Sequence, residues 1–268
     1  MRDHGILATD SVARRINRET FLLLGGTAAL LMQVAHPLVA AGVDQHSSFR
    51  IAPIPRLMHT VDATLGIVFG DRAEAERRLR RIDRIHASVK GRANDGSAYR
   101  ARDPDLLLWV QTTLVLTSVR WYEMVMGRLS DREREAYWNE GKLFAHELGI
   151  PRPRFPATFA DLVRYEADML RNEVVPDATS RAVARDVLRP IARLPGALLW
   201  PNDAVTAALL PAALRNAFGL RYGPAERRFV RAAVVALRTL RPLVPSWFTV
   251  VPQARRYEAA FGPIGPLR

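Results

Sequence analysis

The side chains best suited to chemistry in this sequence are its histidines. Six are present, and four of them, His36, His46, His59 and His86, lie where the helical and apolar signals are strongest. A lone imidazole on an apolar helix face is usually a core residue that hydrogen-bonds locally, but burying several requires a partner for each. This grouping predicts a site that uses imidazole chemistry.

The spacing of the histidines and the composition argue against several common kinds of site. Zinc enzymes need three close ligands, often with two histidines at HxxxH spacing, and no such pair occurs. The absence of cysteine removes Cys-ligated zinc, iron–sulfur clusters and thiolate-ligated haem. The hydrolase motif GxSxG, the P-loop and the dinucleotide motif GxGxxG are also missing. A haem site requires fewer matched residues, because one neutral imidazole on a helix and an apolar pocket suffice.

His86 is well placed to supply the proximal nitrogen to a haem iron. We expect a helix over 73–90, begun by Asp71 as N-cap, in which His86 shares a face with Leu79, Ile82 and Val89. That face is apolar, so the imidazole should point into the interior. Arginines, which are abundant in the chain, would pair with the two haem propionates.

The segment RLMHT, Arg56 to Thr60, is the second candidate. In a helix, Arg56, His59 and Thr60 project from one face because they are three and four residues apart. A guanidinium, an imidazole and a hydroxyl together suit an anion, a haem edge or a bound oxygen species. The alternative is that Arg56 caps a neighbouring helix and His59 is half exposed.

The elements that must position these residues are helices almost throughout. Pro37 should kink or end the first helix, and no sustained alternation predicts a strand. We expect no β-hairpin at NDGSAY, which contains Gly96, because the segment before it is strongly helical. The sequence therefore predicts one all-α domain over 1–268, a multi-helix bundle enclosing a haem, globin-like in packing rather than in topology. The expected helices cover 11–39, 56–69, 73–90, 105–126, 131–148, 157–172 and 224–240, with a looser, proline-punctuated region at 174–211.

The apolar run from Phe21 to Val43 and the basic charge raise the question of membranes. The run is long enough to span a bilayer, but Gly25, Gln33 and Pro37 interrupt it, which favours a buried central helix. The net charge is +12, and its arginines are spread at helical spacing, so we expect no nucleic-acid partner. No signal peptide is recognisable. We expect a cytoplasmic protein, with peripheral membrane association as an open alternative.

Several segments resemble one known family. These are LMQVAHPLVAAGVDQHSSF, RLMHT, RIHASVKG, YRARDPDLLLWVQTTL and YWNEGKLFAHELGIP, in that order. Their order and spacing resemble the DUF2236 family, which contains the MpaB-type oxygenases and the latex-clearing rubber oxygenases. The resemblance is good over 14–151 and continues more weakly through LLPAALRNAFGL.

The resemblance implies a mostly helical fold with haem b, and oxidative chemistry on lipophilic substrates with dioxygen or peroxide. By similarity, His86 of RIHASV would be the proximal ligand. The latex-clearing enzymes have an RxxKT motif on the distal side, and here His59 stands where that lysine would be. We therefore expect both His86 and His59 to bind the iron. One ligand of such a six-coordinate iron would have to dissociate before oxygen binds.

A second departure concerns the distal base. No acidic residue clearly matches the glutamate of the latex-clearing enzymes, so rubber cleavage is poorly supported, and His36 or Asp44 is the substitute we consider. We expect His46 to be structural. Three residues of the helix at 105–126 are expected either to face the site or to be ordinary core positions: Trp109, Thr112 and Thr113.

The function we predict is that of a haem b-dependent oxygenase or peroxygenase acting on a lipophilic small molecule. Its iron ligands would be His86 and His59, and Arg56, Thr60 and His36 would shape the distal pocket. The alternatives are a non-catalytic carrier or sensor that binds haem or a lipophile, and a basic helical protein on a membrane or nucleic acid without haem.

Overall fold

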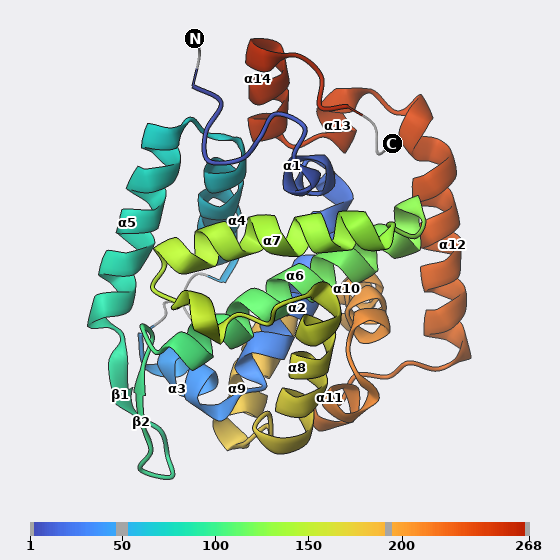
Figure 1. Ribbon diagram of the computed structural model, residues 1–268. Helices are drawn as coiled ribbons and strands as arrows, with labels where there is room; N and C mark the ends of the chain where they lie inside the picture. The colour runs from blue at the N-terminus through green and yellow to red at the C-terminus, as the bar shows by residue number, and fades with distance from the viewer. Residues whose placement is uncertain (1–2, 47–52, 191–194, 266–268) are drawn as a thin grey trace.

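The computed structural model describes residues 3–46, 53–190 and 195–265, and within these it is mostly helical (Figure 1). The all-α prediction is confirmed, apart from one two-stranded sheet. Helix α6 runs through the middle of the structure, and α7 lies across it. The elements in chain order are α1 Val12–Asn17, η1 Thr20–Gly25, α2 Gly26–Val34, α3 Pro37–His46, α4 Pro53–Phe69, α5 Arg72–Ser88, β1 Lys90–Arg92, β2 Ala98–Arg100, α6 Pro104–Met126, α7 Asp131–Glu147, η3 Arg152–Arg154, α8 Phe159–Asn172, α9 Ala178–Leu188, α10 Gly196–Leu209, α11 Ala212–Ala217, α12 Pro224–Leu240, η4 Arg241–Leu243, α13 Ser246–Thr249 and α14 Pro252–Phe261.

The helix starts predicted from capping residues are confirmed. Asp71 accepts the backbone N–H of Glu74 at the start of α5, at 2.7 Å. Asp103 caps α6, with proline at its first position. Ser130 and Glu133 form the expected reciprocal capping box of α7. These local signals work because an uncapped N–H at a helix start loses a hydrogen bond.

The single helix predicted over 11–39 is wrong, because the chain turns several times there. Gly25 lies so close to the indole of Trp121 that a Cβ would be 3.3 Å from the ring. The predicted break at Pro37 is present, and Pro37 itself starts α3, since its missing N–H costs nothing at a first helical position. Helices α2 and α3 consequently meet at an angle of 108°.

The segment around Gly96 is a β-hairpin, so the prediction that no hairpin occurs is wrong. Strands β1 and β2 pair antiparallel, with Gly91 opposite Tyr99. Gly96 has φ of +87°, and its N–H donates to the carbonyl of Ala93. This is a three-residue hairpin loop whose last residue is left-handed, a conformation that glycine adopts without strain. The Asp95-Gly96 pair was a usable signal that the short strands obscured.

The region 174–211 is more regular than predicted. Asp177 caps α9, and α10 accommodates Pro201 inside the helix. Helices α13 and α14, each of which follows a proline or starts with one, had no expected counterpart. Proline-punctuated sequence therefore encodes short helices here, because proline is favourable at their first turns.

Two apolar clusters anchor the helices that carry the histidines. The C-terminal half of α4, with Leu65, Val68 and Phe69, packs into the first cluster around α6 and α7. The start of α3 packs into the second, between α2, α6 and α9, through Ala40. The buried Arg14 donates from Nε to the carbonyl of Val68 at 3.0 Å and so fixes the end of α4.

Candidate functional site

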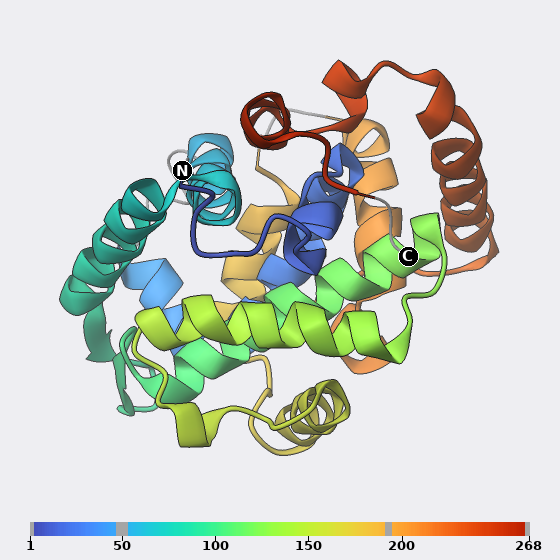
Figure 2. The same ribbon diagram turned by 45° about the horizontal axis from the view of Figure 1, so that its top comes forward.

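Helices α4 and α5 form an antiparallel pair that carries RLMHT on one arm and His86 on the other (Figure 2). The closest approach is at Gly66, where a Cβ would lie 2.1 Å from Nε of Arg78. Arg78 crosses α4 at this glycine and bonds the carboxylate of Asp62 at 2.7 Å. The lack of a side chain at Gly66 therefore permits the ion pair that joins the two helices.

His59 and His86 lie at the same level of this helix pair. His59 is seven residues before Gly66, and His86 is eight residues after Arg78. At 1.5 Å per helical residue these are displacements of about 10 Å and about 12 Å in the same direction, because the helices are antiparallel. His59 is also on the stripe of α4 that contains Asp62 and Gly66, the stripe turned toward α5. The fold therefore brings the two predicted iron ligands to the same end of the hairpin.

His86 is half-buried on the last turn of α5. The predicted face is present: Leu79 is buried, and Ile82 and Val89 are half-buried. Val89 reaches Gly42 of α3, where a Cβ would lie 3.7 Å from its methyl group. The imidazole therefore lies on the less exposed side of α5, toward α3.

The other members of the predicted distal group are less enclosed. His59 and Thr60 are exposed on α4. Arg56 lies in the first turns of α4, and its side chain is outside the described part of the structure. The enclosure of a haem by these residues therefore stays a prediction.

A shallow surface hollow of about 500 Å³ lies along the last two turns of α5, on the exposed face of the helix and not on the face that carries His86. Its described lining consists of Arg81, Arg84, Ile85 and Ser88. Ile85 is half exposed there, and two guanidinium groups flank it. Because side chains three and four residues apart share a helix face, these four residues face away from Ile82 and His86, and the hollow is therefore separate from the candidate haem site. Sequence reasoning had not singled out these arginines, although their three-residue spacing on the helix was visible.

His36 is buried at the start of α3 and acts as its N-cap. Its Nδ1 accepts the backbone N–H of Leu38 at 3.2 Å, so the neutral ring carries its proton on Nε2. Burial lowers the pKa of His36, although the charges of Glu173 and Asp103 raise it in part. The imidazole is therefore held neutral with a fixed tautomer, and this capping role was not foreseen.

The remaining predicted residues have structural roles. His46 bonds the carbonyl of Lys90 through Nε2 at 3.1 Å and ties α3 to the hairpin, as expected of a structural residue. Thr112 and Thr113 donate their hydroxyls to carbonyls of their own helix, both at 2.7 Å. Trp109 is fully buried in the second cluster, in agreement with an ordinary core position. Asp44, on α3, is half-buried.

Two searches over the described residues bear on other kinds of site. Within 3–46, 53–190 and 195–265, no three His, Cys, Asp or Glu residues gather to hold a metal ion. No single helix of the described chain is long and apolar enough to cross a membrane, although Thr20–Val34 and Pro37–His46 together pass on length and composition as a bent pair.

Comparison with known proteins identifies the family. Residues 13–239 match the family described as ER-bound oxygenase mpaB/B'/Rubber oxygenase, catalytic domain. The chain therefore belongs to this family of oxygenase catalytic domains, and the predicted resemblance is confirmed beyond the region of 14–151 that carried it.

Two bacterial relatives align over most of their length. Uncharacterized protein Rv2237 of Mycobacterium tuberculosis and uncharacterized protein Mb2261 of Mycobacterium bovis are each 28% identical to this chain over 244 residues. The alignment covers 83% of this chain and 91% of each relative. No solved structure matches this chain.

Proposed function

We propose that this protein is a haem b-dependent oxygenase or peroxygenase that acts on a lipophilic small molecule. The observation that carries the proposal is the antiparallel packing of α4 and α5 at Gly66, from which His59 and His86 lie at a similar distance toward the same end of the pair. Membership of an oxygenase family supports the oxidative chemistry. A histidine-ligated haem, when bound, would supply the activation of dioxygen or peroxide.

His86 would hold the haem from the proximal side. Its half-buried position on the last turn of α5 limits water around the imidazole. His86 fits the group in that it offers one nitrogen donor on a helix face whose other members, Leu79, Ile82 and Val89, are apolar.

The distal side would be formed by α4. His59 would act as the sixth ligand or as a gate, and Arg56 and Thr60 would supply the polar groups around the oxidant. His36 would line the pocket from α3, where its Nε2–H is the atom available to donate a hydrogen bond. Because the backbone N–H of Leu38 occupies Nδ1, this proton cannot move to the other nitrogen without breaking the helix cap.

The test is an absorption spectrum of the purified chain supplied with haem. We expect a Soret band from the wild type. In His86→Ala this band should be lost, or it should be shifted because haem is bound only weakly. His146→Ala is the matched control, because His146 is exposed on α7 and bonds locally to the carbonyl of Ile150. A wild-type chain that takes up no haem would refute the proposal, and an unchanged spectrum for His86→Ala would refute the proximal assignment.

The same spectra test the role of His59. If both imidazoles bind iron, the resting spectrum is six-coordinate and low-spin, and His59→Ala converts it to five-coordinate. An unchanged coordination state would show that His59 does not ligate.

The position of His59 and His86 at the same height along the α4–α5 pair also favours a second function, that of a non-catalytic haem carrier or sensor. If both imidazoles bound the iron, no coordination position would be left for the oxidant. A low-spin spectrum that carbon monoxide and peroxide never alter would support this alternative over the oxygenase.

A further inference from the structure

Four large apolar side chains lie exposed close together near the C-terminal end of the described chain. Leu240, Leu243, Trp247 and Phe248 have 54%, 78%, 61% and 62% of their surface exposed. The rings of Trp247 and Phe248 contact one another, with centroids 4.6 Å apart. We call these four residues the apolar tip. Ordinary surfaces scatter such side chains singly, so a cluster of this kind marks an interaction site.

A hydrogen bond fastens the apolar tip to η1, a segment from the other end of the chain that carries two exposed leucines. The hydroxyl of Thr20 donates to the carbonyl of Phe248 at 2.7 Å, which fastens η1 to α13. Leu23 and Leu24 follow on η1 and are also exposed. Figure 2 shows α13 and the end of α12 at the edge of the molecule, on the side away from α5. The apolar surface is therefore built from two segments far apart in sequence and is distant from the candidate haem site.

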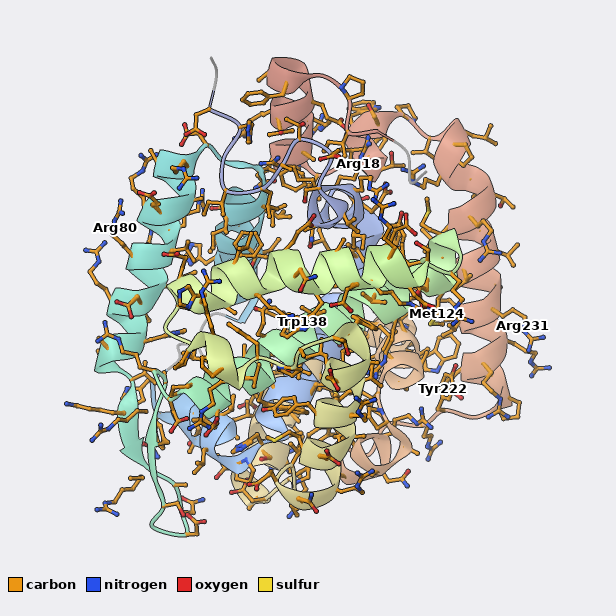
Figure 3. All side chains as sticks on the ribbon, in the orientation of Figure 1. Arg18, Arg80, Met124, Trp138, Tyr222 and Arg231 are labelled. Atoms are coloured by element: carbon orange, nitrogen blue, oxygen red, sulfur yellow. The ribbon has the colours of Figure 1, made fainter. Side chains whose placement is uncertain are left out.

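The charge around the apolar tip is strongly positive. Residues 221–265 contain eight arginines, two glutamates and no aspartate or lysine. Both glutamates are engaged, Glu226 as a cap of α12 and Glu258 in an ion pair with Arg18 at 2.9 Å. Arg228 and Arg231 project from the exposed face of α12, and no hydrogen bond or ion pair joins them to another described residue. Figure 3 shows Arg231 pointing away from the molecule.

We propose that this face docks on an anionic lipid bilayer, with the apolar tip inserted among the headgroups and the α12 arginines against the lipid phosphates. Tryptophan, phenylalanine and leucine beside arginine are the side chains that favour a membrane interface. Arginines near an anionic surface add electrostatic attraction. The docking is peripheral, since the apolar tip is a short projection rather than a span.

A second copy of this chain fits the face less well. Pairing two identical faces would bring both sets of uncompensated arginines together, and like charges at an interface oppose association. An anionic bilayer offers the opposite charge. The proposal does not depend on haem binding or on the oxygenase chemistry, and the experiment below needs neither.

The test uses the full chain and vesicles of phosphatidylcholine, with or without phosphatidylglycerol. We expect cosedimentation with the anionic vesicles and a blue shift of tryptophan emission. Trp247 would report the shift, because Trp109, Trp121 and Trp138 are already fully buried and Trp200 is half-buried. Trp247→Phe should keep the binding and lose most of the shift.

Two double variants separate the apolar and electrostatic contributions. Trp247→Ser with Phe248→Ser should weaken binding at least about tenfold, because two aromatic side chains no longer leave water. Arg228→Gln with Arg231→Gln should weaken binding to anionic vesicles by about fivefold per arginine and leave neutral vesicles unaffected.

Matched controls come from the opposite side of the molecule. Arg80→Gln removes an exposed arginine of α5, which Figure 3 shows projecting away from α12, and Val175→Ser removes an exposed apolar side chain. Neither should change vesicle binding. All these positions are exposed, so thermal unfolding should be the same for every variant and exclude misfolding as a cause.

Three outcomes would overturn the proposal. The first is a wild-type chain that does not bind anionic vesicles. The second is binding that the control variants weaken as much as the variants of the docking face do. The third is a self-association, seen by sedimentation without lipid, that Trp247→Ser with Phe248→Ser abolishes, because a second copy would then cover the face.

Discussion

Replacing His36 separates its capping role from its titration. In the folded chain Nδ1 accepts the N–H of Leu38, and the ring is buried. His36→Asn keeps a side-chain acceptor at the N-cap, where asparagine is among the best residues, but removes the titratable ring. His36→Ala removes both. Comparing the two variants with the wild type therefore distinguishes the cap from the proton.

The magnitudes follow from these contacts. Loss of the cap in His36→Ala costs about 1 kcal/mol, and the cavity left by a buried ring adds roughly 1–3 kcal/mol. The pKa of His36 is lowered by burial, so the unfolded chain binds the proton first as the pH falls. The neutral imidazole therefore stabilises the fold fully above its unfolded pKa of about 6.5. This contribution is lost as the pH falls toward the folded-state pKa, by up to about 1.4 kcal/mol per pH unit.

The assay is urea unfolding at about pH 7.5 and about pH 5.5, which bracket the unfolded histidine pKa. We expect the wild type to lose more stability than His36→Asn between the two values, by up to about 1.4 kcal/mol. The other ionisable groups are common to both proteins and cancel in the difference. Equal losses in the two proteins would refute the claim that His36 is buried neutral, and equal stability of His36→Ala and His36→Asn at the higher pH would refute the capping role.

Two further predictions concern residues that sequence reasoning left open or misjudged. Gly96→Ala should destabilise the fold by about 1 kcal/mol, because φ of +87° strains an L side chain, and a thermal melt with unchanged stability would contradict the hairpin turn. Thr112→Val should leave the haem spectrum and its response to carbon monoxide unchanged, since its hydroxyl bonds the carbonyl of Leu108 in its own helix. A shifted Soret band in this variant would instead place Thr112 at the site.

The parts of the fold that could be predicted are those set by local chemistry. Asp71, Asp103 and Ser130 cap their helices as expected, because a side-chain oxygen beside an unpaired N–H acts within one turn. The face of α5 that contains Leu79 and His86 was also predictable, because helical periodicity alone determines which residues share a face. These inferences need no knowledge of what lies opposite.

The errors arose where distant residues decide the conformation. The chain turns after α1 because Glu19 is buried and paired with Arg241, which is far away in the sequence. Gly25 has no side chain, and this leaves room for the indole of Trp121. No window of local sequence contains these partners. Pro37 was ambiguous in a different way, because proline both ends a helix and starts one, and only the direction of the chain beyond it decides.

The candidate site was predictable in its residue types but not in its geometry. RLMHT and RIHASV suggested His59 and His86 through resemblance to a family. That the two histidines lie at one level depends on Gly66 and Arg78, which set the register of α4 against α5.

The two halves of α4 are stabilised in different ways, and this difference bears on function. Its C-terminal half is held by the core through Val68 and Phe69, and the fully buried Arg14 bonds the carbonyl of Val68. Further toward its start, His59 and Thr60 are exposed and so take little part in apolar packing. A ligand that covers these groups only in the folded chain stabilises the fold in proportion to its affinity. The hairpin therefore joins a base that the core holds near Gly66 to an exposed end, where a ligand covering His59 and Thr60 would add to the stability of the fold.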